Sequence, residues 1–408
     1  MSPRRQAQCR RRLLQAGALL TCSHLCPALG KSSVPVVPAK TLGCSQWPDW
    51  QAFAQQFLSQ DGRVIDRSSA RAHSVSEAQA YALFFSLVAN DAGRFEQLLR
   101  WTQDNLAAGD LSMRLPAWLW GRRDNGSWGV IDENSASDAD LWIAYALGEA
   151  GRLWRERRYV ALSSLLAERI LREESAALPG LGRTLLPGAQ GFALAEGRWR
   201  LNPSYAPLFL LRWFAARSAD ARWQELLQSS LILLRESSPR GFAPDWAFYR
   251  ARPQAAVGDR GAGYFETTQL AAAERVGGYD AIRVYLWLGL TSRDEPARAP
   301  LLAHFAPMGD LLAHQDAPPE TLDVIDGKAT GEGPAGFSEA LLPFLAALGR
   351  DEPLRAQERR LQMQSVRKDA YYEQVLHLFS TGWREGRFAF GADGSLVPAW
   401  APCAESAH

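Results

Sequence analysis

The 408-residue chain has little of what marks several classes of protein. It has no excess of positive charge, with 45 Lys and Arg against 44 Asp and Glu, which argues against nucleic-acid binding. Its 6 His and 5 Cys show no zinc-ligand spacing, so we expect no metal and no cofactor. Beyond the N-terminal segment, no apolar run is long enough to span a bilayer. With hydrophobic residues at 47%, the composition is that of a globular protein.

The N-terminal segment has the pattern of an export signal. Arginines at positions 4 to 12 precede an apolar stretch over residues 13–25, and small residues follow at Ala28 and Gly30. This order is typical of a secretory signal peptide. We therefore predict a signal peptide over residues 1–30, a single domain over residues 31–408 and a periplasmic or secreted mature protein. A basic disordered tail is the alternative interpretation.

Removal of such a signal leaves two cysteines, Cys44 and Cys403, near the two ends of the mature chain. In an oxidising compartment two cysteines most simply form a disulfide. That bond requires their Cα atoms to lie within about 6 Å, which a closed ring of helices permits because it brings the chain ends together. Two independent free thiols are the alternative.

Apolar periodicity predicts successive helices that are joined in pairs by short turns. The predicted helices span residues 47–59, 76–90, 93–107, 138–154, 157–172, 204–217, 220–235, 268–274, 280–290, 297–313, 337–348, 353–365 and 369–382. Helical hairpins without βαβ alternation or a fixed-period repeat favour an all-α toroid formed as one domain. We also predict small β-hairpins at 192–201 and 387–397, and surface loops at 251–263 and 316–334.

An acidic residue lies at the start of one strongly apolar predicted helix. Glu77 follows Ser76 there, and Ser76 with Gln79 matches a capping box. An acid in the first turn is also favoured by the helix dipole. A purely structural role is therefore the alternative to catalysis for Glu77.

Two further helix starts carry acidic residues. Asp138 and Asp140 lie two positions apart and point to different faces, so we expect Ser137 and Asp140 to cap the helix while Asp138 faces a cleft. Asp280 follows a glycine turn, and a helix cap paired with Arg283 is its structural alternative. In a ring of antiparallel helices, alternate helices point their N-termini toward the same end. We therefore expect the three acidic sites to converge.

The chain has 15 Trp, an unusually large number, and flat aromatic faces suit the binding of sugars. Candidate substrate-binding residues, with core packing as their alternative, are Trp118, Trp120, Trp128, Tyr205 and Tyr81. Trp142 lies inside a predicted helix and is expected in the core. Arg283 is expected either to orient Asp280 or to contact a sugar hydroxyl.

Hydrolysis of a glycosidic bond needs carboxyl groups of this kind. One must be protonated to assist the leaving oxygen, and a second must be ionised to activate water. The helix dipole stabilises the anion of Glu77, so burial and a neighbouring carboxylate must raise the pKa of Glu77 if it serves as the acid.

The run from Ala136 to Asp140, followed by Ile143 and Gly148, resembles the signature of glycoside hydrolase family 8. Other runs that resemble this family are 76–81, 114–121, 134–140, 202–205 and 279–285. The resemblance covers essentially the whole mature chain. It implies an (α/α)6 barrel with small β-hairpin insertions and an inverting endo-β-1,4-glucanase.

The resemblance also implies roles for individual residues. Glu77 falls on the family's general acid, Asp280 on its general base, and Asp138 on the aspartate that holds and distorts the sugar at the cleavage point. One departure is Ala78, where many relatives have glycine; it adds a methyl group beside the acid. The longer 251–263 segment is expected to change the edge of the cleft.

The resemblance further implies a β-1,4-glucan (cellulose) chain as substrate, a role in bacterial cellulose biosynthesis and a contact with the cellulose synthase complex. Two kinds of alternative stay open. One is a chitosanase or xylanase with the same fold. The other is a non-hydrolytic periplasmic protein that binds glucan and guides it.

Overall fold

The computed structural model describes residues 46–253, 261–268 and 270–401, all within one compact unit. The predicted signal peptide over residues 1–30 and the predicted pair Cys44 and Cys403 lie outside these described residues. Within the described ranges, no helix is both long and apolar enough to cross a membrane.

Twelve α-helices make up nearly half of the described residues. They are α1 (Pro48–Phe57), α2 (Ser76–Val88), α3 (Ala92–Leu106), α4 (Ser137–Leu153), α5 (Arg157–Glu173), α6 (Leu208–Arg217), α7 (Arg222–Glu236), α8 (Ile282–Leu290), α9 (Arg298–Leu311), α10 (Ala335–Leu348), α11 (Asp351–Met363) and α12 (Tyr371–Arg384). Each of these helices confirms a predicted one within a few residues at either end.

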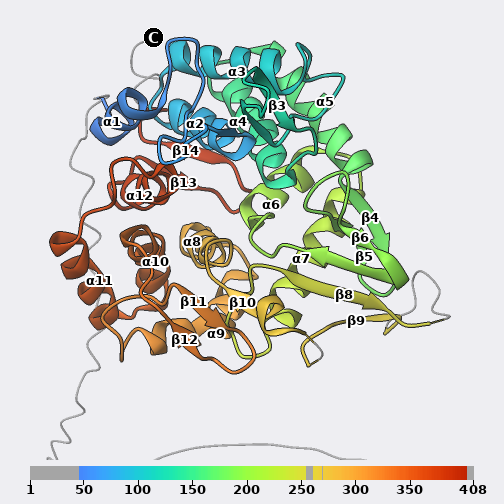
Figure 1. Cartoon of the computed structure of the whole chain (residues 1–408), viewed down its shortest axis with the longest axis vertical. Helices are drawn as coiled ribbons and strands as arrows, with labels where there is room; N and C mark the ends of the chain where they lie inside the picture. The colour runs from blue at the N-terminus through green and yellow to red at the C-terminus, as the bar shows by residue number, and fades with distance from the viewer. Residues whose placement is uncertain (1–45, 254–260, 269, 402–408) are drawn as a thin grey trace, which may run out of the picture. The chain divides into compact units, whose positions relative to one another are not determined.

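The helices form two concentric rings. The inner ring is α2, α4, α6, α8, α10 and α12, in which successive members pack against each other and α12 returns to α2. The outer ring is α1, α3, α5, α7, α9 and α11, each packed against an inner helix (Figure 1). Six inner and six outer helices form an (α/α)6 barrel, as predicted.

The apolar pattern of each helix explains its ring. Nearly every residue of α2 and all residues of α8 are buried, because an inner helix has neighbours on every side. The outer helices α3 and α5 are amphipathic and bury one stripe each. An inner helix followed by an antiparallel outer helix repeats around the ring. All six inner N-termini therefore lie at one end of the barrel.

Aromatic side chains fill the centre of the barrel. Trp142 is fully buried, which confirms its predicted place in the core, and its ring contacts Phe84, Trp287 and Phe379. The C-terminal hairpin adds Phe390, whose ring stacks on Phe209 at 3.9 Å between centroids. The axis is therefore a packed core, and the inner N-termini form the end that carries acidic side chains.

The small sheets are antiparallel; four lie in the connections between helices, and the fifth follows the last helix, α12. Their strands are β1 (Ser74–Val75), β2 (Leu119–Arg122), β3 (Trp128–Asp132), β4 (Ser175–Leu178), β5 (Gly182–Leu185), β6 (Ala193–Leu194), β7 (Arg198–Leu201), β8 (Ala247–Ala251), β9 (Gly263–Phe265), β10 (Val276–Gly277), β11 (Thr321–Asp323), β12 (Ala329–Thr330), β13 (Phe388–Phe390) and β14 (Leu396–Pro398). The sheets are β1-β2-β3, β4-β5, β6-β7-β8-β9, β10-β11-β12 and β13-β14.

The two predicted hairpins are confirmed as β6–β7 and β13–β14. The turn of the first is at Glu196 and Gly197, both at positive φ. Two predictions are wrong. The 268–274 helix is only a 3-10 turn at Ala272–Glu274, and the 316–334 loop contains the paired strands β11 and β12. The predicted 251–263 loop connects β8 to β9, and residues 254–260 within it are not described.

Candidate active site

Three acidic residues predicted from sequence lie at the inner helix N-termini. Glu77 is the second residue of α2, Asp138 is the second residue of α4, and Asp280 lies two residues before α8. Since these three helices run in the same direction around the barrel, their first turns face the same end. The predicted convergence is a consequence of that shared direction.

Arg283 joins two of the acids. Its Nη1 donates to Oδ2 of Asp138 at 2.8 Å, and its Nη2 donates to Oδ1 of Asp280 at 2.6 Å. Nη1 also donates to the Tyr81 hydroxyl at 3.0 Å. Arg283 is only 5% exposed, so these are charge-assisted bonds in a largely dry environment. Of the two roles predicted for Arg283, the structure shows the contact that orients Asp280.

Asp138 is the most enclosed of the three acids, at 1% exposure. Its Oδ1 accepts the backbone N–H of Ala139 at 2.9 Å, and its Oδ2 accepts from Arg283. Burial raises the pKa of Asp138, and the negative charge of Asp280 adds to that effect while Arg283 opposes it. Both oxygens are fixed, so Asp138 is a rigid group beside the other two acids.

Glu77 lies in surroundings that favour its protonated form. Burial, followed by the charge of Asp138, raises the pKa of Glu77 to about 8. Trp118 opposes this shift, because its Nε1 donates to Oε1 of Glu77 at 3.2 Å and stabilises the anion. The Ser76 hydroxyl lies 3.3 Å from the other oxygen. Burial and the neighbouring Asp138 therefore outweigh the stabilisation of the Glu77 anion by the helix dipole, as a role as general acid requires.

Asp245 is a site residue that the sequence analysis missed. Its Oδ1 accepts three backbone N–H groups, from Gly278 at 2.8 Å, Asp280 at 2.9 Å and Ala281 at 2.8 Å. The carboxyl group therefore caps the start of α8 from a distant segment and fixes the backbone of Asp280. Burial raises the pKa of Asp245, and the three N–H bonds counteract it.

The capping roles predicted for the other helix starts are wrong. The N-cap residues of α2 and α4 are Val75 and Ala136, and neither helix has a side-chain cap. Gln79 instead accepts the Val64 N–H at 2.6 Å and donates to Gly62 and Thr102, because the 62–64 segment packs against it. Ser137 and Asp140 are fully buried inside the first turn of α4, and Asp140 faces Glu174 instead.

The predicted aromatic residues divide into exposed and buried members. Trp118 is 37% exposed and Trp128 is 51% exposed, so both have faces open to solvent. Trp120 stacks on Trp128 with centroids 5.5 Å apart, and the Arg63 guanidinium lies over both rings. The stacked Trp120 and Trp128 rings and the Arg63 cation form an aromatic cluster at the β2–β3 hairpin, and Trp128 is its solvent-exposed member.

Tyr205 and Tyr81 lie on either side of Arg283. Tyr205 is half-buried, with the Arg283 guanidinium carbon 5.4 Å from its ring centroid. Tyr81 is buried beneath Arg283 and supports it. Trp246 was not predicted from the sequence; its ring centroid lies 6.1 Å from that of Tyr205 and 3.6 Å from the guanidinium of Arg200.

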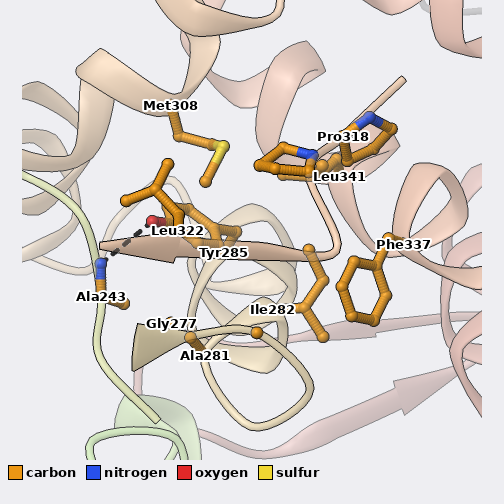
Figure 2. A pocket seen from close by; sticks show the side chains of 12 residues that line it. Ala243, Gly277, Ala281, Ile282, Tyr285, Met308, Pro318, Leu322, Phe337 and Leu341 are labelled. Atoms are coloured by element: carbon orange, nitrogen blue, oxygen red, sulfur yellow. Dashed lines mark hydrogen bonds between the residues drawn. The ribbon is translucent and has the colours of Figure 1, made fainter. Parts of the chain in front are cut away.

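A small apolar cavity lies behind the first turn of α8 (Figure 2). Ile282, Tyr285 and Phe337 line it, and its volume of about 20 Å³ admits one water but no sugar ring. The Tyr285 hydroxyl accepts the backbone N–H of Ala243 at 3.0 Å, the contact dashed in Figure 2. This cavity therefore belongs to the support of the Ala243–Asp245 segment, not to substrate binding.

Comparison with known proteins gives a consistent result. The model of glycosyl hydrolases family 8 matches residues 36–386. An endoglucanase of Salmonella typhi is 47% identical over 358 residues, which cover 88% of this chain and 92% of that protein. An endoglucanase of Xanthomonas axonopodis pv. citri is 45% identical over 394 residues, covering 96% of this chain and 97% of that protein.

A solved structure gives the same result in three dimensions. The endo-1,4-D-glucanase from Vibrio fischeri ES114 superposes with a TM-score of 0.77 at 41% identity, covering 87% of this chain and 99% of that one. The barrel, its acidic end and these likenesses define a glycoside hydrolase. Within that class, the chain belongs to glycosyl hydrolase family 8.

Proposed function

We propose that this chain is an endo-β-1,4-glucanase that cleaves with inversion. One observation carries the proposal: two carboxyl groups at the same end of the barrel have opposite environments. Glu77 has a pKa raised to about 8, so it keeps its proton at neutral pH. Asp280 instead receives a 2.6 Å bond from the Arg283 guanidinium, as an ionised partner does.

In this mechanism Glu77 is the general acid and Asp280 is the general base. Glu77 donates its proton to the glycosidic oxygen while Asp280 removes a proton from the attacking water. The water adds to the anomeric carbon from the face opposite the leaving group, so the configuration inverts. Asp138, whose two oxygens are fixed, holds the sugar at the cleavage point.

The aromatic residues supply the faces on which the glucan chain stacks. Trp118 touches the acid through its indole N–H and is partly open to solvent. Trp120 and Trp128, which stack on each other, and Tyr205, which lies beside Arg283, are the further aromatic residues assigned to substrate binding. The names of the relatives from Salmonella typhi and Xanthomonas axonopodis, both endoglucanases, support a β-glucan substrate.

We further propose that the mature protein is periplasmic or secreted and acts in bacterial cellulose biosynthesis, in contact with the cellulose synthase complex. The signal-like N-terminus and the sequence motifs support this. Co-purification of the mature chain with that complex from its host tests the contact, and its absence from the complex would contradict it. A single catalytic domain over residues 31–408 and a Cys44–Cys403 disulfide remain predictions.

The activity is tested on carboxymethylcellulose by viscosity and reducing-end release, for the mature wild type and Glu77→Gln. A steep viscosity fall at low reducing-end yield, lost in the variant, is the expected result. Glu225→Gln is the matched control, because Glu225 is also in a first helical turn but is exposed on α7. Bound glucan without new chain ends would favour a binding protein. Faster cleavage of xylan or chitosan would assign another substrate.

A further inference from the structure

Two acidic side chains lie side by side beneath the site. Asp140 in α4 and Glu174, directly after α5, are both fully buried. Among the described residues, no N–H group or hydroxyl donates to either oxygen of Asp140 or to Oε2 of Glu174. The two carboxyl groups are within hydrogen-bonding reach of each other. Since an ionised carboxylate can only accept, they can bond only if one of them keeps its proton.

The surroundings of the pair favour keeping that proton. Burial raises the pKa of Glu174 to about 8, and burial together with Glu174 raises the pKa of Asp140 well above its ordinary value. The titratable groups that face the pair are Glu77 from α2, Asp138 from α4 and Glu173 from α5. All three are acids, and each disfavours additional negative charge when it is ionised. The pair therefore carries at most one negative charge at neutral pH.

Glu174 connects the pair to the segment that leads into α4. The Ser135 hydroxyl donates to Oε1 of Glu174 at 2.6 Å and accepts the Ala189 N–H at 3.1 Å. The neighbouring Asn134 side chain bonds both backbone groups of Gln190, at 3.1 Å and 2.9 Å. The position of the Asn134–Ser135 segment is thus fixed by Glu174 on one side and by the 189–190 backbone on the other.

The same segment continues to the proposed general acid. The Asn134 carbonyl accepts the Trp118 backbone N–H at 2.6 Å, and the Trp118 carbonyl accepts the Ser76 N–H at 2.9 Å. Trp118 is therefore held between Asn134 and the residue that precedes Glu77. Its indole N–H then donates to Glu77. A continuous path of hydrogen bonds and adjacent residues runs from Asp140 and Glu174 through Ser135, Asn134 and Trp118 to Glu77.

We infer that Asp140 and Glu174 are positioning residues, which share one proton and thereby hold the segment that places Trp118 against Glu77. The inference rests on the proposed role of Glu77 as the general acid. Oε2 of Glu174 needs a donor from position 140, which an amide supplies and a hydrocarbon does not. Asn matches Asp in size, whereas Leu matches its branching but is bulkier, so Ser135→Ala and a comparison of two substrates are needed to separate loss of the donor from overpacking.

The test compares Asp140→Asn with Asp140→Leu, and adds Ser135→Ala, which cuts the path without changing the pair. Two substrates are used. Cellopentaose has a leaving group that needs a proton, whereas 2,4-dinitrophenyl β-cellobioside has one that leaves as an anion. In Asp140→Leu and Ser135→Ala, we expect kcat on cellopentaose to fall about 10-fold to 100-fold. In these two variants, we expect KM on cellopentaose and kcat on the aryl glycoside to stay within about threefold of wild type. For Asp140→Asn, we expect both kcat and KM to stay within about threefold of wild type on both substrates.

Equal kinetics for Asp140→Leu and Asp140→Asn, or equal losses on the two substrates, would overturn the inference. Glu77→Gln is measured in parallel to separate this result from a failure of the proposed function. If Glu77→Gln still cleaves cellopentaose at the wild-type rate, the assignment of the acid fails. If Glu77→Gln loses only the cellopentaose activity while the Asp140 and Ser135 variants match wild type, the acid stands and the positioning role is wrong.

Discussion

Replacement of Arg283 by Met should destabilise the protein and slow catalysis together. Arg283 is the cation that bridges Asp138 and Asp280, and Asp138 is almost completely buried. Removing one partner of a buried ion pair costs about 3–5 kcal/mol. Most of that cost falls on Asp138, since the Asp280 side chain is 28% exposed and water screens its charge.

The loss should depend on pH. Without Arg283, the pKa of Asp138 rises further above its unfolded value of about 3.9. An acid whose folded pKa is raised makes the folded state less stable as pH rises above the unfolded pKa, until the group ionises in the folded state. The difference in unfolding free energy between wild type and Arg283→Met should therefore be larger at pH 7 than at pH 5. Urea unfolding at the two pH values measures it.

Arg212→Met is the matched control. Arg212 bonds both oxygens of Glu295, at 2.6 Å and 2.8 Å, and the Glu295 side chain is 3% exposed. Arg212 lies in α6 and Glu295 follows the C-terminal end of α8, so the pair is away from the acids at the inner helix N-termini. We expect a similar loss of stability with kcat retained. A loss below about 1 kcal/mol for Arg283→Met at pH 7, or unchanged kcat, would refute the bridging role.

Three further predictions concern the acid and its neighbours. Because Glu77 acts only when protonated, kcat on carboxymethylcellulose should fall as pH rises through about 8; activity constant to pH 10 would contradict this. In Trp118→Phe the anion of Glu77 loses a hydrogen-bond donor, so the pKa of Glu77 should rise and the alkaline limb of the same pH profile should move to higher pH. An alkaline limb at the wild-type pH would count against the contact. Asp245→Ala removes the acceptor of three N–H groups; urea unfolding should show a loss of about 2–3 kcal/mol, with kcat reduced more than KM is changed. Wild-type kinetics would show that Asp245 does not position Asp280.

The barrel is largely predictable from the sequence, because its helices are long enough for the apolar period to be seen. The inner α4 and the outer α5 each span 17 residues, and their predicted bounds differ from the observed ones by about one residue. The convergence of Glu77, Asp138 and Asp280 follows from helix direction alone. A strand such as β1, with 2 residues, is too short to show alternation, and several short strands were missed for that reason.

The contacts that tune the site are not predictable in the same way. Ser76 and Gln79 match a capping box locally, but the amide of Gln79 is used by a segment that the barrel brings to it. Asp245 caps α8 from 35 residues away from Asp280, and Glu174 meets Asp140 only because α4 and α5 pack together. Each of these partners depends on tertiary packing and leaves no local pattern in the sequence.

The decisive measurement is the anomeric configuration of the first product. Proton NMR of cellopentaose hydrolysis, recorded before mutarotation equilibrates the new reducing ends, distinguishes the two stereochemical outcomes. With Glu77 as general acid and Asp280 activating water, the newly formed ends should first be the α-anomer. Initial release of the β-anomer would mean that a carboxylate attacks the sugar directly, and it would contradict the roles proposed for Glu77 and Asp280.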